Sequence, residues 1–356
     1  MQQTHDTYMR RCLQLALLGQ GKVAPNPMVG AVLVHEGRII GEGWHRQYGG
    51  PHAEVNCVAS VLEKGRHLVG QSTMYVSLEP CAHFGKTPPC ADLILEHKIP
   101  KVVVGCRDPF PLVAGKGIEK LRLAGVEVTL GVLEQECQEL NKRFFLFHVQ
   151  HRPFIILKWA QTADGRISGK PGARLKISNE YSNRLVHRWR SEEASILVGT
   201  NTALADNPAL NTRLWPGANP IRLVLDLQSR LPQSLQVFDG SIPTLVFNLR
   251  QHTIENGSQL RHAKGGVYYY QVAEDASLVH QIVHALYQLQ VQSVFVEGGA
   301  QLLQSFIDEG LWDEARIITN ESLIIGEGLP APVLNQHRLQ EVLPLHEDII
   351  RFYQHS

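Results

Sequence analysis

The feature that most constrains the fold of this 356-residue chain is a set of three potential metal ligands, His52, Cys81 and Cys90. An imidazole nitrogen and two thiolates fill three corners of a tetrahedral Zn²⁺ site and leave the fourth corner for water. The apolar spacing of Val55, Val58 and the residues after them predicts a helix that begins beside His52. The fold of the first half must therefore bring the start of this helix and both cysteines to one point.

Glu54 lies two residues after His52, so both side chains project from the first turn of the predicted helix. Zinc lowers the pKa of a bound water towards roughly 7, and a neighbouring carboxylate can transfer its protons. An H-x-E motif followed by a cysteine pair is typical of zinc-dependent nucleobase deaminases. This chain departs from the usual pattern because the eight residues 82–89 separate Cys81 from Cys90. We predict a catalytic zinc site with Glu54 as the proton shuttle. A closed structural zinc, with His83 as fourth ligand, is the main alternative.

Composition excludes several classes of function. The 34 basic residues balance the 34 acidic ones, so the chain lacks the basic footprint of a nucleic-acid-binding protein and favours a small-molecule substrate. The sequence has no apolar run of membrane-spanning length and no secretory signal, which predicts a cytoplasmic protein that does not bind membranes. All six cysteines fall within the first 137 residues. The four outside the metal motif are predicted to be small core residues: Cys12, Cys57, Cys106 and Cys137.

The chain length predicts two domains, residues 1–150 and 151–356, with the break near Pro153. Helix and strand patterns alternate in both halves, which predicts two α/β domains. The first should contain one continuous helix over 134–147. The second has no G-x-G-x-x-G after its first strand, and its polar segment 251–266 is expected to be a surface loop.

Several motifs indicate a family. Asn26-Pro27-Met28-Val29-Gly30, together with residues 78–90 ending in Thr87-Pro88-Pro89-Cys90, closely resembles the deaminase of riboflavin biosynthesis. Asp164-Gly165-Arg166, residues 202–213 and Val296-Glu297-Gly298-Gly299-Ala300 resemble the reductase half of the same bifunctional family. The resemblance implies a cytidine-deaminase-like α/β/α domain and a dihydrofolate-reductase-like α/β domain, with one zinc per chain and NADPH.

The resemblance also implies the reactions. The first is hydrolytic deamination of 2,5-diamino-6-(5-phosphoribosylamino)pyrimidin-4-one, a phosphorylated pyrimidine. The second is NADPH-dependent reduction of its ribosyl side chain to ribityl. A homo-oligomer without nucleic-acid partners is expected.

The family's binding residues transfer to matching positions here. The implied substrate contacts are Asn26, His83, Lys86, Arg190, Leu210, Arg213 and Glu297. The implied cofactor contacts are Lys158, Ala160, Lys176, Thr202, Asp206, Gly298, Gly299, Ala300, Gln301, Leu302 and Leu303. Physical reasoning supports parts of this set, because two glycines before a helix let backbone N–H groups approach a phosphate, and arginines bind phosphate bidentately.

Simpler interpretations stand beside these roles. His83, Lys86, Lys158 and Lys176 could be solvated side chains, and Asn26 a turn residue. His35 and His45 are predicted to be ordinary surface or satisfied histidines. Two other functions compete with the bifunctional enzyme: a tRNA deaminase, and a degenerate reductase half that only scaffolds the deaminase. The neutral charge and the long cysteine loop disfavour the first, and Asp206, Arg213 and Glu297 disfavour the second.

Overall fold

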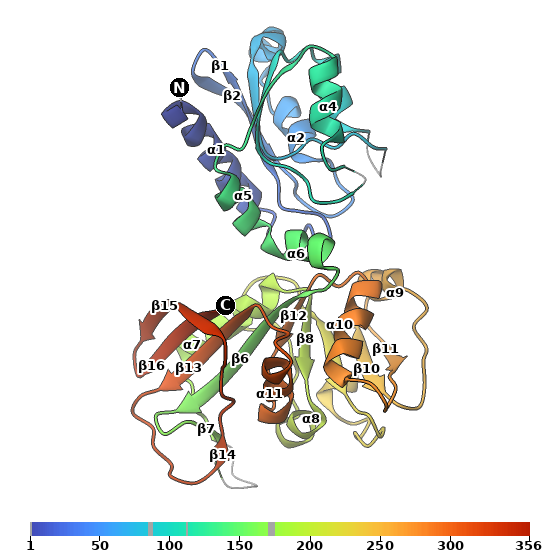
Figure 1. Cartoon of the computed structure of the whole chain (residues 1–356), viewed down its shortest axis with the longest axis vertical. Coiled ribbons are helices and arrows are strands. Elements are labelled where there is room, and N and C mark those ends of the chain that lie inside the picture. The colour runs from blue at the N-terminus through green and yellow to red at the C-terminus, as the bar shows by residue number, and fades with distance from the viewer. Residues whose placement is uncertain (1, 85–87, 112, 170–174) are drawn as a thin grey trace. The chain divides into compact units, whose positions relative to one another are not determined.

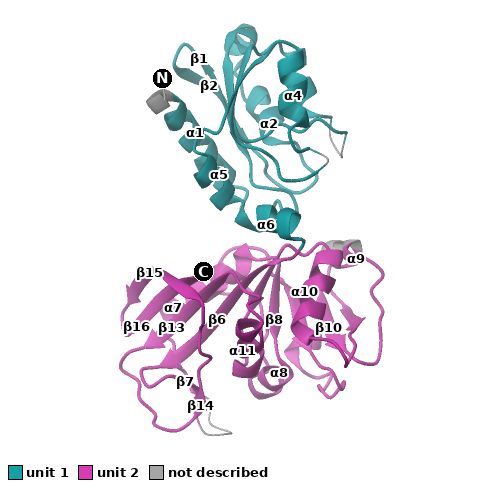
Figure 2. Ribbon diagram, viewed as in Figure 1, with its two compact units in different colours: residues 1–151 teal, residues 152–356 magenta. Residues whose placement is uncertain are grey.

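The computed structural model describes residues 2–84, 88–111, 113–169 and 175–356. The chain divides into two compact units, residues 1–151 and 152–356 (Figure 2). The predicted boundary lies at residue 150. No helix in the described part of the chain is both long enough and apolar enough to cross a bilayer.

Unit 1 is a five-stranded sheet with helices on both faces (Figure 1). The strand order is β2-β1-β3-β4-β5; β1 pairs antiparallel with β2 and β3, and β3, β4 and β5 run parallel. Its elements are α1 (Gln2–Leu17), β1 (Gly30–His35), β2 (Arg38–Trp44), α2 (Ala53–Ala59), η1 (Glu63–Gln71), β3 (Thr73–Leu78), α3 (Cys90–Glu96), β4 (Lys101–Cys106), α4 (Lys116–Leu123), β5 (Glu127–Leu130), α5 (Glu134–Leu140) and α6 (Lys142–Gln150).

Alternating side chains divide the core of unit 1 into two layers, as the period of a strand requires. From β1, Ala31 and Leu33 pack with α2 and α3, whereas Val32 and Val34 pack with α1 and α5. The four cysteines outside the metal motif are free and buried, as predicted. The sheet, covered on both faces, confirms the expected α/β/α domain and holds α2 and α3 on one side of it.

The prediction of one continuous helix over 134–147 is wrong in one respect, because the helical region divides at Asn141 into α5 and α6. The Asn141 side chain accepts a hydrogen bond from the N–H of Met28 and donates one to the carbonyl of Met28, both at 2.8 Å. These two bonds tie the helical region to the segment before β1. Helical periodicity gives no indication of a hydrogen-bond partner so distant in sequence.

Unit 2 is built on a nine-stranded sheet of order β11-β10-β9-β8-β12-β6-β13-β16-β15. The strands from β11 to β13 run parallel, and β16 and β15 form an antiparallel edge. Its elements are β6 (Phe154–Thr162), β7 (Arg166–Ser168), α7 (Glu180–Glu192), β8 (Ser195–Val198), α8 (Thr200–Asp206), β9 (Ile221–Leu225), η2 (Gln236–Phe238), β10 (Thr244–Asn248), α9 (Gly257–His262), β11 (Val267–Gln271), α10 (Leu278–Gln288), β12 (Ser293–Val296), α11 (Ala300–Asp308), β13 (Glu314–Asn320), β14 (Leu329–Pro330), β15 (His337–Leu345) and β16 (Asp348–His355).

Helices cover both faces of this sheet. Val294 and Val296 of β12 belong to the core that includes α10 and α11. Phe295 points to the other face, where its ring lies 6.3 Å from that of Trp189 on α7. The carboxyl ends of β8 and β12, which are hydrogen-bonded neighbours, therefore lie side by side with helices following each.

The polar segment 251–266 is not purely a surface loop. It contains the short helix α9, and Ile254 and Leu260 are buried in the main core of unit 2. The expectation was wrong because two apolar residues spaced along a polar segment are enough to anchor it.

Candidate functional sites

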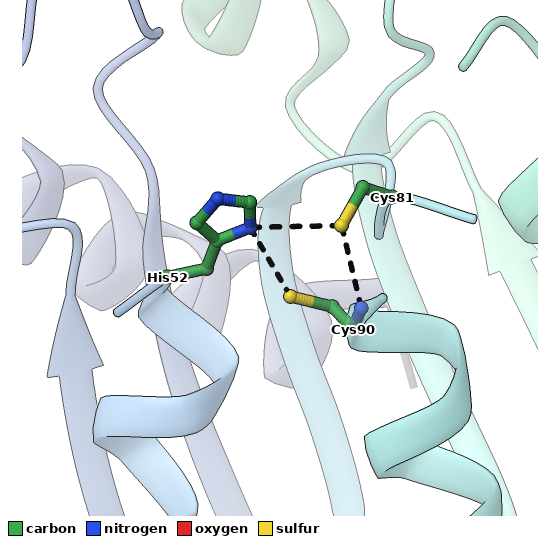
Figure 3. A group of neighbouring side chains, drawn as sticks. All are labelled: His52, Cys81 and Cys90. Atoms are coloured by element: carbon green, nitrogen blue, oxygen red, sulfur yellow. Dashed lines mark hydrogen bonds between the residues drawn. The ribbon is translucent and has the colours of Figure 1, made fainter. Parts of the chain in front are cut away.

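The three predicted metal ligands come together in unit 1. His52 caps the N-terminus of α2, and Cys90 is the first residue of α3. Nδ1 of His52 lies 3.6 Å from Sγ of Cys81 and 3.3 Å from Sγ of Cys90, as Figure 3 shows. Tetrahedral Zn²⁺ with ordinary bond lengths places nitrogen and sulfur ligands about 3.6 Å apart. The arrangement therefore fits a zinc ion.

In the part of the chain that the structure describes, the cluster contains three potential ligands. Within the described residues, the group of potential ligand atoms lying within 4.8 Å of one another consists of His52, Cys81 and Cys90. His83 is not a member, although its Nδ1 is buried and lacks a hydrogen-bond partner. Its ring instead lies 6.4 Å from that of Phe110. This geometry favours an open site over a closed structural one.

A hydrogen bond between the two thiols shifts their pKa values in opposite directions. A hydrogen bond with Cys90, opposed by burial and supported by His52, lowers the pKa of Cys81 to about 4. The same hydrogen bond raises the pKa of Cys90. The backbone N–H of Cys90 also donates to Sγ of Cys81 at 3.3 Å. One thiolate is thus available at neutral pH for a metal.

Glu54 lies beside this cluster in the first turn of α2 and is only 3% exposed. Burial raises the pKa of its carboxyl above the ordinary value, while His52 acts in the opposite direction. A carboxyl with a raised pKa can both accept and return a proton near neutral pH. Lys86, the other predicted contact of this loop, lies outside the described residues.

His45 is a buried histidine with both ring nitrogens hydrogen-bonded, as the prediction of a satisfied histidine allowed, and it lies between Asn26 and His52. The side chain is 2% exposed and its ring lies 5.4 Å from that of His52. Nδ1 lies 3.0 Å from the carbonyl of Pro51, so it carries the proton, and Nε2 accepts from Nδ2 of Asn26 at 3.1 Å. The amide nitrogen of Asn26 is thereby engaged, which fixes its oxygen as the free polar atom.

Glu79, two residues before Cys81, was also missed. Its buried carboxylate accepts hydrogen bonds from the backbone N–H groups of Asp108, Gly115, Gly117 and Ile118. These bonds give hydrogen-bond acceptors to the backbone N–H groups at the start of α4, which have none within the helix. They also fix the end of β3 immediately before the metal-binding cysteine. The Glu-Pro-Cys sequence at positions 79–81 was the signal from which a structural role of Glu79 beside the metal ligand could have been predicted.

In unit 2 the predicted substrate residues Arg190 and Glu297 bind each other. Nε and Nη2 of Arg190 each donate to the Glu297 carboxylate at 2.7 Å, and the two side chains are 11% and 9% exposed. Burial alone would raise the pKa of Glu297, but attraction by Arg190 and Lys158 outweighs it and lowers the pKa to about 2. The Arg190 fork is therefore paired with Glu297 in this structure, and its expected role as a bidentate phosphate clamp stays a prediction.

Lys158 belongs to the same charged group. It lies on β6, and the register of that strand places it on the face that α7 covers. Burial, partly offset by attraction to Glu297, lowers the pKa of its ammonium group. Ala160 follows on the same face, whereas Lys176 is exposed.

Part of the predicted cofactor set, Thr202 and Gly298 to Ala300, lies at the carboxyl ends of β8 and β12. Gly199 and Gly299 cap α8 and α11, and the N–H of Gly199 donates to the carbonyl of Gly298 at 2.9 Å. A Cβ on Gly299 would lie 3.0 Å from Oγ1 of Thr202. The first turn of α11 leaves N–H groups without helical acceptors, as phosphate binding requires.

The remaining predicted residues divide into two kinds. The side chains of Leu210, Leu302 and Leu303 are buried, so their backbones are what a ligand could reach. Arg213 and Asp206 are exposed, and Nη1 of Arg213 donates to Oδ1 of Asn211 at 2.9 Å.

Comparison with known proteins agrees with both units. The family model "Cytidine and deoxycytidylate deaminase zinc-binding region" matches residues 2–106, and "RibD C-terminal domain" matches residues 153–350. Fold and site thus define a zinc-dependent deaminase joined to an NADPH-dependent reductase. The chain is 39% identical over 361 residues to the riboflavin biosynthesis protein RibD of Aquifex aeolicus, covering 97% of each. It belongs to the RibD family of riboflavin biosynthesis proteins.

Solved structures give the same result. A deaminase/reductase from Thermotoga maritima is 37% identical, with a TM-score of 0.87, covering 100% of this chain and 99% of that one. RibD of Acinetobacter baumannii is 30% identical, also with a TM-score of 0.87, and both chains are covered completely. The riboflavin-pathway prediction is confirmed at the level of family and fold.

Proposed function

We propose that unit 1 deaminates 2,5-diamino-6-(5-phosphoribosylamino)pyrimidin-4-one and that unit 2 then reduces the ribosyl group of the product with NADPH. The observation that carries the deaminase assignment is the three-ligand cluster of His52, Cys81 and Cys90 with buried Glu54 beside it. Membership of the RibD family supports the choice of substrate.

In the deaminase, His52 and the two cysteines would hold zinc, which supplies an activated water when bound. Glu54 is placed to hold a proton taken from the attacking water and to deliver protons to the ring nitrogen and the departing amine. The C–NH₂ group and water become C=O and NH₃, so atoms balance. The oxygen of Asn26, fixed through His45, is oriented to accept a hydrogen bond from the pyrimidine.

In the reductase, the N–H groups at the start of α11 are suited to a phosphate of NADPH, which supplies a hydride to the ribosyl C1. Glu297, paired with Arg190 and attracted by Lys158, is proposed as a substrate contact because the family resemblance implies it. The occupied Arg190 fork leaves the phosphate of the substrate to Arg213, whose guanidinium is exposed.

Cys90→Ser tests the assignment in the full chain. The variant should lose zinc and ammonia release while it still oxidises NADPH with the deaminated pyrimidine. Metal analysis, ammonia release and NADPH absorbance are the measurements. Cys57→Ser, which alters a buried cysteine away from the metal ligands, is the control and should keep zinc. Zinc-free wild type with full deaminase activity would refute the metal assignment. Expressing 1–151 and 152–356 separately then tests whether each unit carries its own reaction.

A further inference from the structure

Unit 2 contains a buried histidine, His187, that the proposed function does not use. It lies on α7, three residues before Arg190, and only 4% of its surface is exposed. Its Nδ1 atom is buried and has no hydrogen-bond partner in the described structure. A buried polar atom without a partner has lost hydration without compensation, so this nitrogen indicates a missing ligand.

The face of α7 that carries His187 also carries residues that line an open groove. Asn183 and Arg184, one helical turn before His187, line this groove together with residues 213–216. Its volume is about 710 Å³. Residues three and four positions apart share a helix face. His187 therefore shares this helix face with Asn183 and Arg184, towards Arg190, and is buried beside the groove without being one of its lining residues.

Charged groups surround His187 from three elements. Arg190 comes from its own helix, Arg213 from the segment after α8, and Glu297 from the end of β12, with Lys158 beside Glu297. Asn211 connects them, because its carbonyl accepts from Arg190 and its side-chain oxygen accepts from Arg213. Burial, then repulsion by the two arginines, lowers the pKa of His187 to about 4, against the opposing effects of Glu297 and the Asn211 backbone. The imidazole is thus neutral near pH 7.

We propose that His187 binds the phosphate group of the substrate together with Arg213 and takes up a proton from solvent as the phosphate enters. The proposal rests on the proposed reductase function. A phosphate dianion reverses the local field that keeps the imidazole neutral. The protonated ring then donates from Nδ1 to a phosphate oxygen, and this gives the orphaned nitrogen its partner.

Calorimetric titration of the full chain with ribose 5-phosphate tests this, at pH 6.5 in buffers of different ionisation enthalpy. His187→Asn places a non-titrating amide near Nδ1 and should abolish the extra proton uptake of the wild type while keeping measurable binding. His187→Phe should weaken binding roughly 10- to 100-fold, as expected for a lost charge-assisted hydrogen bond. It should also raise the KM of the deaminated pyrimidine with little change in kcat. His284→Asn, an exposed histidine on α10, is the control.

Retained ammonia release and NADPH binding would show that each variant is folded. Equal proton uptake by wild type and His187→Asn would overturn the protonation step. Ribose 5-phosphate binding by His187→Phe equal to that of wild type would overturn the phosphate contact. The titration needs neither NADPH nor turnover. Wild type that takes up the proton but never reduces the pyrimidine would therefore refute the proposed function and leave the His187 site standing.

Discussion

Glu297→Gln removes one charge from a buried ion pair, and its cost can be worked out from the structure. The pKa of Glu297 falls from an ordinary value of 4.5 to about 2, with burial opposing and Arg190 and Lys158 causing the decrease. That difference corresponds to about 3 kcal/mol of stability. The value agrees with the 3–5 kcal/mol typical of breaking a buried pair. The variant should lose about this much at pH 7, together with its reductase activity.

The dependence on pH gives a second check. A carboxylate with a depressed pKa stabilises the folded state fully above its unfolded pKa, and this contribution is lost as pH falls from about 4.5 towards 2. The difference between wild type and variant should therefore shrink over that range. Urea unfolding followed by tryptophan fluorescence suits the measurement, because four of the five tryptophans, Trp159, Trp189, Trp215 and Trp312, lie in unit 2.

Glu192→Gln is the matched control, because Glu192 pairs on the same helix with Arg188, whose side chain is 49% exposed. That change should cost less than about 0.5 kcal/mol. A loss below about 1 kcal/mol for Glu297→Gln would place the buried pair in the range of surface pairs and refute the reasoning.

Three further predictions concern activity. Glu54→Gln should keep zinc and lose at least about 10²-fold in the rate of ammonia release; loss of zinc instead would show that Glu54 is a ligand. Gly299→Val should raise the KM of NADPH, because a side chain there meets Thr202 and blocks close approach of a phosphate; an unchanged KM would place the phosphate elsewhere. Prolonged chelation should stop ammonia release and spare NADPH oxidation; loss of both activities would contradict independent sites.

Local patterns predicted those elements whose side chains are buried throughout. The mainly apolar residues 244–248 form β10, and the mainly apolar residues 74–78 form β3 together with Thr73. Both are mainly apolar and buried along nearly their whole length, which is typical of strands covered on both faces. The motif around His52 likewise predicted a helix start, which the structure contains at α2.

Features that depend on a distant partner could not be predicted. The break at Asn141 depends on Met28, and the burial of His45 depends on Asn26 and Pro51. The Arg190–Glu297 pair joins a helix to a strand end 107 positions away. Each residue type fits several environments, and only tertiary structure selects one.

Gly117 links the end of the chain segment 108–118 to the metal site. A Cβ at this position would lie 1.8 Å from the carbonyl oxygen of Pro80, the residue immediately before Cys81. Any side chain there must push Pro80 away, and with it the sulfur that binds metal. Pro80 is also held from the other direction, because Glu79 next to it is bonded to the N–H of Gly117. Substitution of Gly117 should therefore lower the affinity for zinc, although this glycine carries no ligand atom and lies outside the metal-binding motif.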